Sequence, residues 1–135
     1  MERHKIIAEA REWINTPFQH QGRTKGTAVD CIGLIYGVAK NLGIAPDGLP
    51  QEFIGYTRIP DNGKLEQALD KYMDRIRMSE VQPGDVYLMA YSRHAPQHVG
   101  ITTGKTLIHA FARKCVEHTL SNSWRRRICG AYRFR

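Results

Sequence analysis

One stretch decides how this chain folds: Asp30-Cys31-Ile32-Gly33-Leu34-Ile35-Tyr36-Gly37-Val38-Ala39-Lys40-Asn41-Leu42-Gly43, residues 30–43. Its apolar side chains recur at i, i+3, i+4, i+7 and i+11, the spacing of one face of an α-helix; they are Cys31, Leu34, Ile35, Val38 and Leu42. Asp30 suits a helix N-cap and Gly43 suits a helix end. The pattern predicts a helix that begins at Cys31 with the cysteine on its buried face.

A cysteine at the first turn of a helix is a candidate nucleophile. The unpaired N–H groups and the positive end of the helix dipole favour thiolate over thiol there, which predicts a pKa for Cys31 below about 8.5. The carboxylate of Asp30 opposes ionisation, so an imidazolium close to the sulfur is needed to tip the balance. The alternative is an inert core thiol, because cysteine is often buried.

Hydrophobic patterning around this stretch predicts helices first and a sheet second, an antiparallel α+β fold. The expected helices span residues 3–14, 31–43 and 65–73, and the expected strands span residues 85–90, 97–103, 106–112, 114–119 and 128–134. Residues 17–29 and 43–62 have no period and are expected to be irregular connections. The length of 135 residues predicts a single domain over residues 1–135.

Hairpin geometry selects the histidine that serves Cys31. A two-residue turn at Gly104-Lys105 makes the numbers of paired residues sum to 209, so His98 and His109 share a face as diagonal neighbours about 7–8 Å apart. A three-residue loop would put them on opposite faces. If the register slips in that way, Gln97 or His94 would have to orient the base instead.

On the shared-face register the sequence supplies a nucleophile, a base and an orienting group. Cys31 would attack a carbonyl carbon, His98 would hold its proton and pass it to the leaving amine, and His109 would fix the His98 ring. The oxyanion would meet the backbone N–H of Cys31 and one further donor, for which His20 and Gln21 are candidates. The alternative is that His98 and His109 are ordinary core histidines.

Other histidines and cysteines allow a zinc interpretation, on His94, His98, His109, Cys115 and His118. No second closely spaced pair accompanies Cys115 and His118, so the sequence predicts no metal and no cofactor. Three cysteines at wide spacing do not form a disulfide framework. His118 is expected to be solvated or to bond locally.

The chain is basic: Lys+Arg 20 and Asp+Glu 13 give 20 − 13 = +7. Such a surface attracts polyanions and carboxylate-rich substrates alike. Trp124-Arg125-Arg126-Arg127 suits nucleic acid, but a solvated turn between strands explains it better, so nucleic acid is not expected as the partner. Charge interrupts the first residues before a secretory signal can form, and no membrane span is expected.

Five motifs in order resemble those of the NlpC family of cysteine peptidases: Thr16-Pro17-Phe18, Asp30-Cys31-Ile32-Gly33-Leu34, Pro83-Gly84-Asp85-Val86, His98-Val99-Gly100-Ile101 and Ile108-His109-Ala110. The segments Phe18-Gln19-His20-Gln21 and Lys25-Gly26 are most similar to the branch found in phage tails and gene transfer agents. The resemblance covers residues 5–111.

The resemblance implies a papain-like NlpC fold and a cysteine endopeptidase that hydrolyses stem peptides of bacterial peptidoglycan, typically between D-γ-glutamate and a diamino acid. It gives Cys31, His98 and His109 the catalytic roles already assigned, and it implies that Asp30 helps to hold the free amine of the substrate. It also implies a phage tail-associated enzyme, made in the cytoplasm and carried to the cell wall, with tail proteins as partners.

Two positions depart from the family pattern. Phe18 stands where relatives commonly have tyrosine, which removes a hydroxyl near the nucleophile. Ile32 replaces a small polar residue and makes the pocket wall more apolar. The alternative function is therefore a structural tail-tip assembly protein that keeps the fold with weak or no activity.

Overall fold

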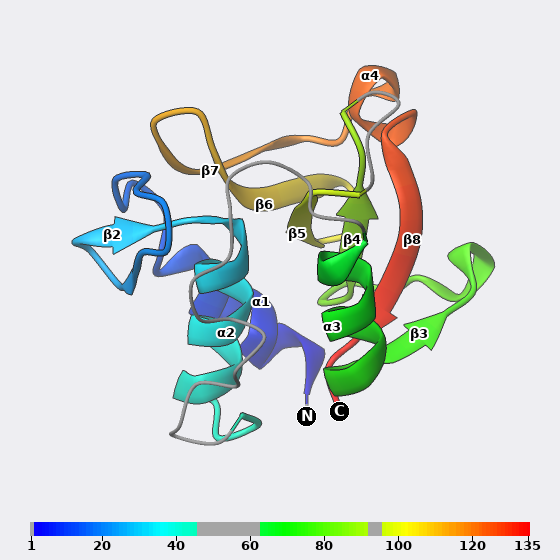
Figure 1. Ribbon diagram of the computed structural model, residues 1–135, viewed down its shortest axis with the longest axis horizontal. Coiled ribbons are helices and arrows are strands. Elements are labelled where there is room, and N and C mark those ends of the chain that lie inside the picture. Colours follow the sequence, from blue (N-terminus) through cyan, green and yellow to red (C-terminus); the bar gives the residue numbers. More distant parts are fainter. Residues whose placement is uncertain (1, 46–62, 92–95) are drawn as a thin grey trace.

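The computed structural model describes residues 2–45, 63–91 and 96–135. Its helices are α1 (Arg3–Arg11), α2 (Cys31–Asn41), α3 (Lys64–Tyr72) and α4 (Asn122–Arg125), with a 3-10 turn at Met78–Glu80 (Figure 1). Its strands are β1 (Arg23–Thr24), β2 (Ala28–Val29), β3 (Asp74–Ile76), β4 (Val86–Met89), β5 (His98–Thr102), β6 (Thr106–Phe111), β7 (Lys114–Thr119) and β8 (Ile128–Arg133).

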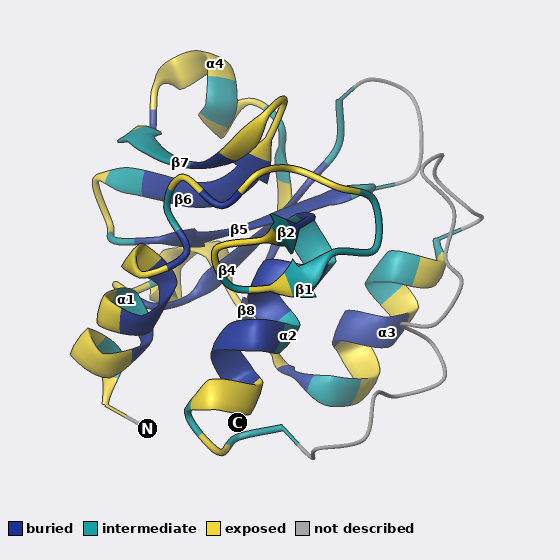
Figure 2. Ribbon diagram, turned by 90° about the vertical axis from the view of Figure 1, so that its left-hand side faces the viewer, coloured by how far each residue is buried: buried dark blue, intermediate teal, exposed yellow. Residues whose placement is uncertain are grey.

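Six strands form one antiparallel sheet in the order β3-β8-β4-β5-β6-β7. Helices α1, α2 and α3 cover one face, and α4 lies over the other (Figure 2). A separate two-stranded ribbon, β1-β2, precedes α2. The α+β class, with a cysteine-led helix packed on a central antiparallel sheet, is confirmed.

The sheet separates two apolar clusters because successive side chains of a strand point to opposite faces. Val86 and Leu88 of β4 join the larger cluster under the helices. Tyr87 and Met89 join the smaller cluster on the α4 side, together with Leu107 of β6. His109, two residues after Leu107, therefore faces the α4 side.

The first helix is shorter than its apolar pattern predicts. It ends at Arg11, but Trp13 donates its backbone N–H to Ala10 at 3.0 Å and Thr16 donates to Trp13 at 3.0 Å, so winding continues as tighter i→i−3 turns. Pro17 disfavours a regular helix just before it. Trp13 is buried all the same, which is why the helical period extends past the helix.

Other expected elements hold to within a few residues, with three differences. The irregular connection at 17–29 contains the short ribbon, and the solvated turn near Trp124 is the helical turn α4. Strand β3 is an edge strand paired with β8, and its sequence alternates too briefly to have been predicted. Most of the connection at 43–62 lies outside the described residues.

The register of the β5-β6 hairpin is the predicted one. Ile101 pairs with Ile108 and Thr102 with Leu107, both summing to 209. Thr103 donates its N–H to the Thr106 carbonyl at 3.1 Å, closing a turn in which Gly104 has φ 97°. Positive φ favours glycine at that position.

Candidate active site

Asp30 organises the start of helix α2. Its Oδ1 accepts the N–H of Gly33 at 2.7 Å, as an N-cap does, and its Oδ2 accepts the N–H of Gln21 at 2.7 Å. The side chain is buried. The N-cap prediction is confirmed, and the same carboxylate also fixes the loop before the helix.

Gly33 allows that loop to lie directly on the helix. A Cβ at Gly33 would stand 1.9 Å from the carbonyl oxygen of Gly22, closer than any side chain permits. The same carbonyl accepts the N–H of Asp30 at 3.2 Å. The glycine two residues after the cysteine is therefore needed for a close backbone approach beside Cys31.

The thiol of Cys31 lies against the first residues of β5. Its Sγ is 4.0 Å from the carbonyl oxygen of Gln97, and the backbone N–H of Val99 also interacts with the sulfur. These two backbone groups flank His98. Cys31 begins α2 and His98 begins β5, so the two elements bring their first residues to the same place.

Burial controls ionisation at this site, and the predicted low pKa of Cys31 is wrong for the resting protein. Burial, followed by the charge of Asp30, raises the pKa of the Cys31 thiol to about 12, and nearby backbone N–H groups offset only part of this. Burial, with the charge of Arg127, lowers the pKa of His98 to about 3. The dipole and N–H groups of one helix turn do not outweigh desolvation, so the resting groups are a neutral thiol and a neutral imidazole.

His98 and His109 form the predicted imidazole pair. Nε2 of His98 and Nδ1 of His109 are 2.6 Å apart, and both rings are buried. Gly100 makes room for them, since a Cβ there would lie 3.1 Å from Cβ of His109. With this register Gln97 is not needed to orient the base, and His94 lies outside the described residues.

A third imidazole, that of His118, extends the pair. The sequence predicted only that His118 is solvated or bonds locally. Nε2 of His109 is 2.8 Å from Nε2 of His118, and Nδ1 of His118 is 2.9 Å from the carbonyl oxygen of Thr119. The sequence signal that could have predicted this contact is the β6-β7 hairpin. Phe111 pairs with Lys114 across a turn at Ala112-Arg113, and this register places His118 diagonally opposite His109. That turn was obscure because Ala112 adopts φ 61°, which alanine seldom does.

Aromatic side chains wall the histidines on the α4 side. The Trp124 ring centroid lies 4.8 Å from that of His109 and 5.3 Å from that of His118, and Phe111 stacks on His109 at 5.4 Å. Tyr91, at the end of β4, approaches His98 at 5.4 Å. Trp124 thus packs against the histidines, whereas Arg125 and Arg126 of the same turn are exposed, as the sequence suggested.

The two candidate oxyanion donors, His20 and Gln21, lie beside Asp30. The backbone N–H of Gln21 is taken by Asp30, and Nδ1 of His20 is 4.0 Å from Oδ2 of Asp30. All three cysteines, Cys31, Cys115 and Cys129, are free thiols. Within the described ranges, no group of three or more His, Cys, Asp or Glu side chains is arranged to hold a metal ion.

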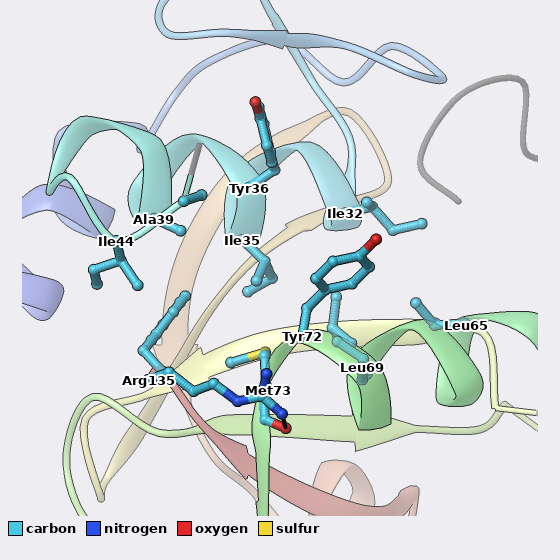
Figure 3. A pocket seen from close by; sticks show the side chains of 13 residues that line it. Ile32, Ile35, Tyr36, Ala39, Ile44, Leu65, Leu69, Tyr72, Met73 and Arg135 are labelled. Atoms are coloured by element: carbon cyan, nitrogen blue, oxygen red, sulfur yellow. Dashed lines mark hydrogen bonds between the residues drawn. The ribbon is translucent and has the colours of Figure 1, made fainter. Parts of the chain in front are cut away.

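An apolar pocket of about 260 Å³ opens between α2 and α3 (Figure 3). Ile32 and Val99, the neighbours of Cys31 and His98, line one side, and Leu69 of α3 and Met73, directly after α3, line the other. Ile32 therefore contributes an apolar side chain to a pocket next to the first residue of α2.

Cys31 begins α2, and a hydrogen-bonded imidazole pair lies on β5 and β6 of the antiparallel sheet. The chain belongs to the NlpC/P60 family, whose model matches residues 15–133. No curated protein sequence matches it. In the parts of the chain that the structure describes, no helix has the length and apolar character to cross a membrane.

Solved structures share the fold. The NlpC/p60 domain of the peptidoglycan hydrolase SagA aligns with a TM-score of 0.69 and 21% identity, over 98% of each chain. An NlpC/P60 family protein from Bacillus cereus aligns with a TM-score of 0.74 and 18% identity, over 99% of this chain and 40% of its own. A lipoprotein-like NLP/P60 protein from Staphylococcus aureus aligns with a TM-score of 0.67 and 25% identity, over 98% and 41%. The chain thus spans about two fifths of the latter two proteins.

Proposed function

We propose that this protein is a cysteine endopeptidase that hydrolyses a peptide bond in the stem peptides of bacterial peptidoglycan. The observation that carries the proposal is the position of the Cys31 sulfur, which lies against the backbone on both sides of His98. The His98 ring is in turn hydrogen-bonded to His109. Membership in the NlpC/P60 family, and the hydrolase SagA among the similar structures, support peptidoglycan as the substrate.

The reaction follows from which nitrogen of His98 is occupied. Its Nε2 is bonded to His109, so its Nδ1 takes the proton of the Cys31 thiol as the sulfur attacks the carbonyl carbon. The backbone N–H of Cys31 stabilises the oxyanion, and the C–N bond breaks as His98 returns the proton to the leaving amine. Water, deprotonated by His98, then cleaves the thioester and restores the thiol.

The resting site is neutral, so proton transfer accompanies substrate binding. The thiol and the imidazole of His98 both avoid charge because they are buried. When substrate binds, negative charge develops on its carbonyl oxygen, and the first turn of α2 stabilises that charge. This allows the proton to move from the Cys31 thiol to His98. Catalysis therefore depends on substrate-coupled formation of the thiolate.

The finer parts of the proposal concern the bond and the biological setting. The net charge of +7 suits the free carboxylates of stem peptides. We place the cut between D-γ-glutamate and the diamino acid, with Asp30 helping to hold the substrate amine, and the enzyme in a phage tail that carries it to the wall. The motif resemblance at Phe18-Gln19-His20-Gln21 supports the tail setting.

Mass spectrometry of muropeptides incubated with the protein tests the reaction, the bond and the nucleophile together. Wild type should release stem-peptide fragments, and Cys31→Ser and His98→Ala should each lower the rate by at least about 10³-fold. The matched controls are Cys129→Ser, at an exposed thiol, and His4→Ala, on the surface of α1, which should retain full activity.

Three outcomes would overturn the proposal. Fragment release that survives Cys31→Ser would exclude the assigned nucleophile. Intact peptidoglycan together with binding to a tail protein would favour the structural tail-tip alternative, and salt-sensitive DNA binding unaffected by Cys31→Ala would favour a nucleic-acid module.

A further inference from the structure

Three imidazoles form an unbroken hydrogen-bonded row across neighbouring strands β5, β6 and β7. The row runs from Nε2 of His98 to Nδ1 of His109 at 2.6 Å, and from Nε2 of His109 to Nε2 of His118 at 2.8 Å. It ends at a backbone atom, because Nδ1 of His118 is 2.9 Å from the carbonyl oxygen of Thr119. We call His98, His109 and His118, with this carbonyl, the histidine row.

The terminal carbonyl determines where every proton of the row resides. A carbonyl oxygen only accepts, so Nδ1 of His118 carries a hydrogen, and Nε2 of the neutral ring is then an acceptor. Nε2 of His109 must donate to it, which leaves Nδ1 of His109 as an acceptor. Nε2 of His98 must donate in turn, so Nδ1 of His98 keeps its lone pair.

We propose that His118 is a positioning residue that, through His109, holds His98 in the tautomer whose Nδ1 is free to accept a proton. The inference deepens the proposed peptidase function and rests on it for the role of that nitrogen. His118 does not touch the reacting atoms. Its effect is transmitted by two hydrogen bonds whose donors and acceptors are fixed by the Thr119 carbonyl.

The row also offers a path for positive charge. When His98 binds a second proton, its Nε2 proton can pass to Nδ1 of His109 while the Nε2 proton of His109 passes to Nε2 of His118. His98 and His109 each gain one proton and lose one, so the charge ends on His118. His98 and His109 are buried, whereas His118 is partly exposed, so the move takes charge from a dry ring to one nearer water.

Burial disfavours positive charge on His98 and on His109. It lowers the pKa of His98 to about 3, and burial together with the two neighbouring histidines lowers the pKa of His109 to about 2. Trp124 and Phe111 cover His109, which keeps water from replacing either hydrogen bond of its ring. Without His109 and His118, a positive charge on the buried His98 ring could not move toward water.

The tautomers can be measured without any activity. Long-range ¹H–¹⁵N spectra of the histidine rings, recorded on the wild-type protein at pH 7.5, should show His98 and His109 protonated at Nε2 and His118 protonated at Nδ1. A wild-type His98 protonated at Nδ1 would overturn the proposal, whatever the protein hydrolyses. This readout needs no variant, so it stands even if a substitution prevents folding.

Two substitutions of His118 test its role. His118→Gln keeps an oxygen that accepts from Nε2 of His109, whereas His118→Leu removes the acceptor and frees His109 to exchange tautomers. Leucine should give mixed tautomers at His98 and lower kcat about 10- to 100-fold with KM unchanged, and glutamine should keep the tautomers and most of kcat. His4→Gln, at an exposed histidine, is the matched control.

The outcomes separate the inference from the function. Wild-type tautomers that persist in His118→Leu, or equal kcat for the leucine and glutamine variants with a folded protein, would exclude the positioning role. Mixed tautomers in His118→Leu, in a protein whose wild type cleaves no peptidoglycan, would support the row and reject the peptidase proposal.

Discussion

The two halves of the candidate site are built in different ways. The start of α2 is a local structure, in which Asp30 caps the helix that Cys31 begins and Gly33 receives the preceding loop. The histidine row is a tertiary structure, since His98, His109 and His118 meet only because three strands pair in one register. Local capping therefore positions Cys31, and strand pairing positions the three imidazoles.

The comparison also concerns charge. A helix start supplies N–H groups and a favourable dipole, yet burial still raises the pKa of Cys31. The row supplies polar partners for every ring, yet burial still lowers the pKa of His98 and His109. Both halves are therefore held neutral at rest. Four predictions test this neutrality and the separate roles of helix capping and strand pairing.

The largest effect of a single substitution is expected at Gly33, where the local structure is tightest. Gly33→Ala places a Cβ 1.9 Å from the Gly22 carbonyl, so the loop must leave the helix and the Asp30 bonds are lost. We expect the free energy of unfolding to fall by about 3 kcal/mol or more, as measured by urea denaturation. If the free energy of unfolding falls by less than about 1 kcal/mol, the contact between the loop and α2 does not stabilise the protein as proposed.

Acid should destabilise the protein through the histidine row. His98 and His109 have a lower pKa in the folded than in the unfolded state, so below about pH 6.5 the unfolded state binds more protons and stability falls. Between pH 6.5 and 5 the unfolding free energy should drop by up to about 1.4 kcal/mol per pH unit for each ring. Urea denaturation across this range measures the slope, and His4→Gln should leave it unchanged.

A glycine pair tests the packing of the row. In Gly100→Ala the new Cβ meets Cδ1 of Leu107 at 2.7 Å and Cβ of His109 at 3.1 Å, which displaces the His109 ring. We expect a loss of about 1–3 kcal/mol in stability and a lower kcat. Gly130→Ala is the matched control in β8, because its Cβ would come as close as 3.0 Å only to the far end of the Arg75 side chain. Equal losses for the two would show that His109 is not held by this contact.

The smallest effect concerns the resting thiol. Because burial raises the pKa of Cys31, its alkylation by iodoacetamide at pH 7 should be at least about tenfold slower than in the unfolded chain. The rate should still rise with pH through pH 9, since thiolate continues to accumulate. Peptide mass spectrometry measures it for each cysteine. A rate that is already at a plateau below pH 7 would show a preformed thiolate–imidazolium pair.

Much of the site was predictable from single elements. The apolar period after Asp30 and the turn at Gly104-Lys105 sufficed to place Cys31 at a helix start and to pair His98 with His109, because both signals are local. His118 escaped prediction because its turn uses Ala112 at φ 61°, a conformation that the sequence does not announce. Trp124 escaped because its contacts with the histidines come from a segment far along the chain.

The sequence by itself determined the helix cap, the cysteine at its first residue, the hairpin register and the net charge of +7, since each depends on neighbouring residues or on composition. Tertiary structure alone decided the ionisation of Cys31 and His98 and the extension of the imidazole pair to His118. The physical reason is that desolvation and cross-strand hydrogen bonds depend on what surrounds a group in space, and residues distant in sequence supply those surroundings.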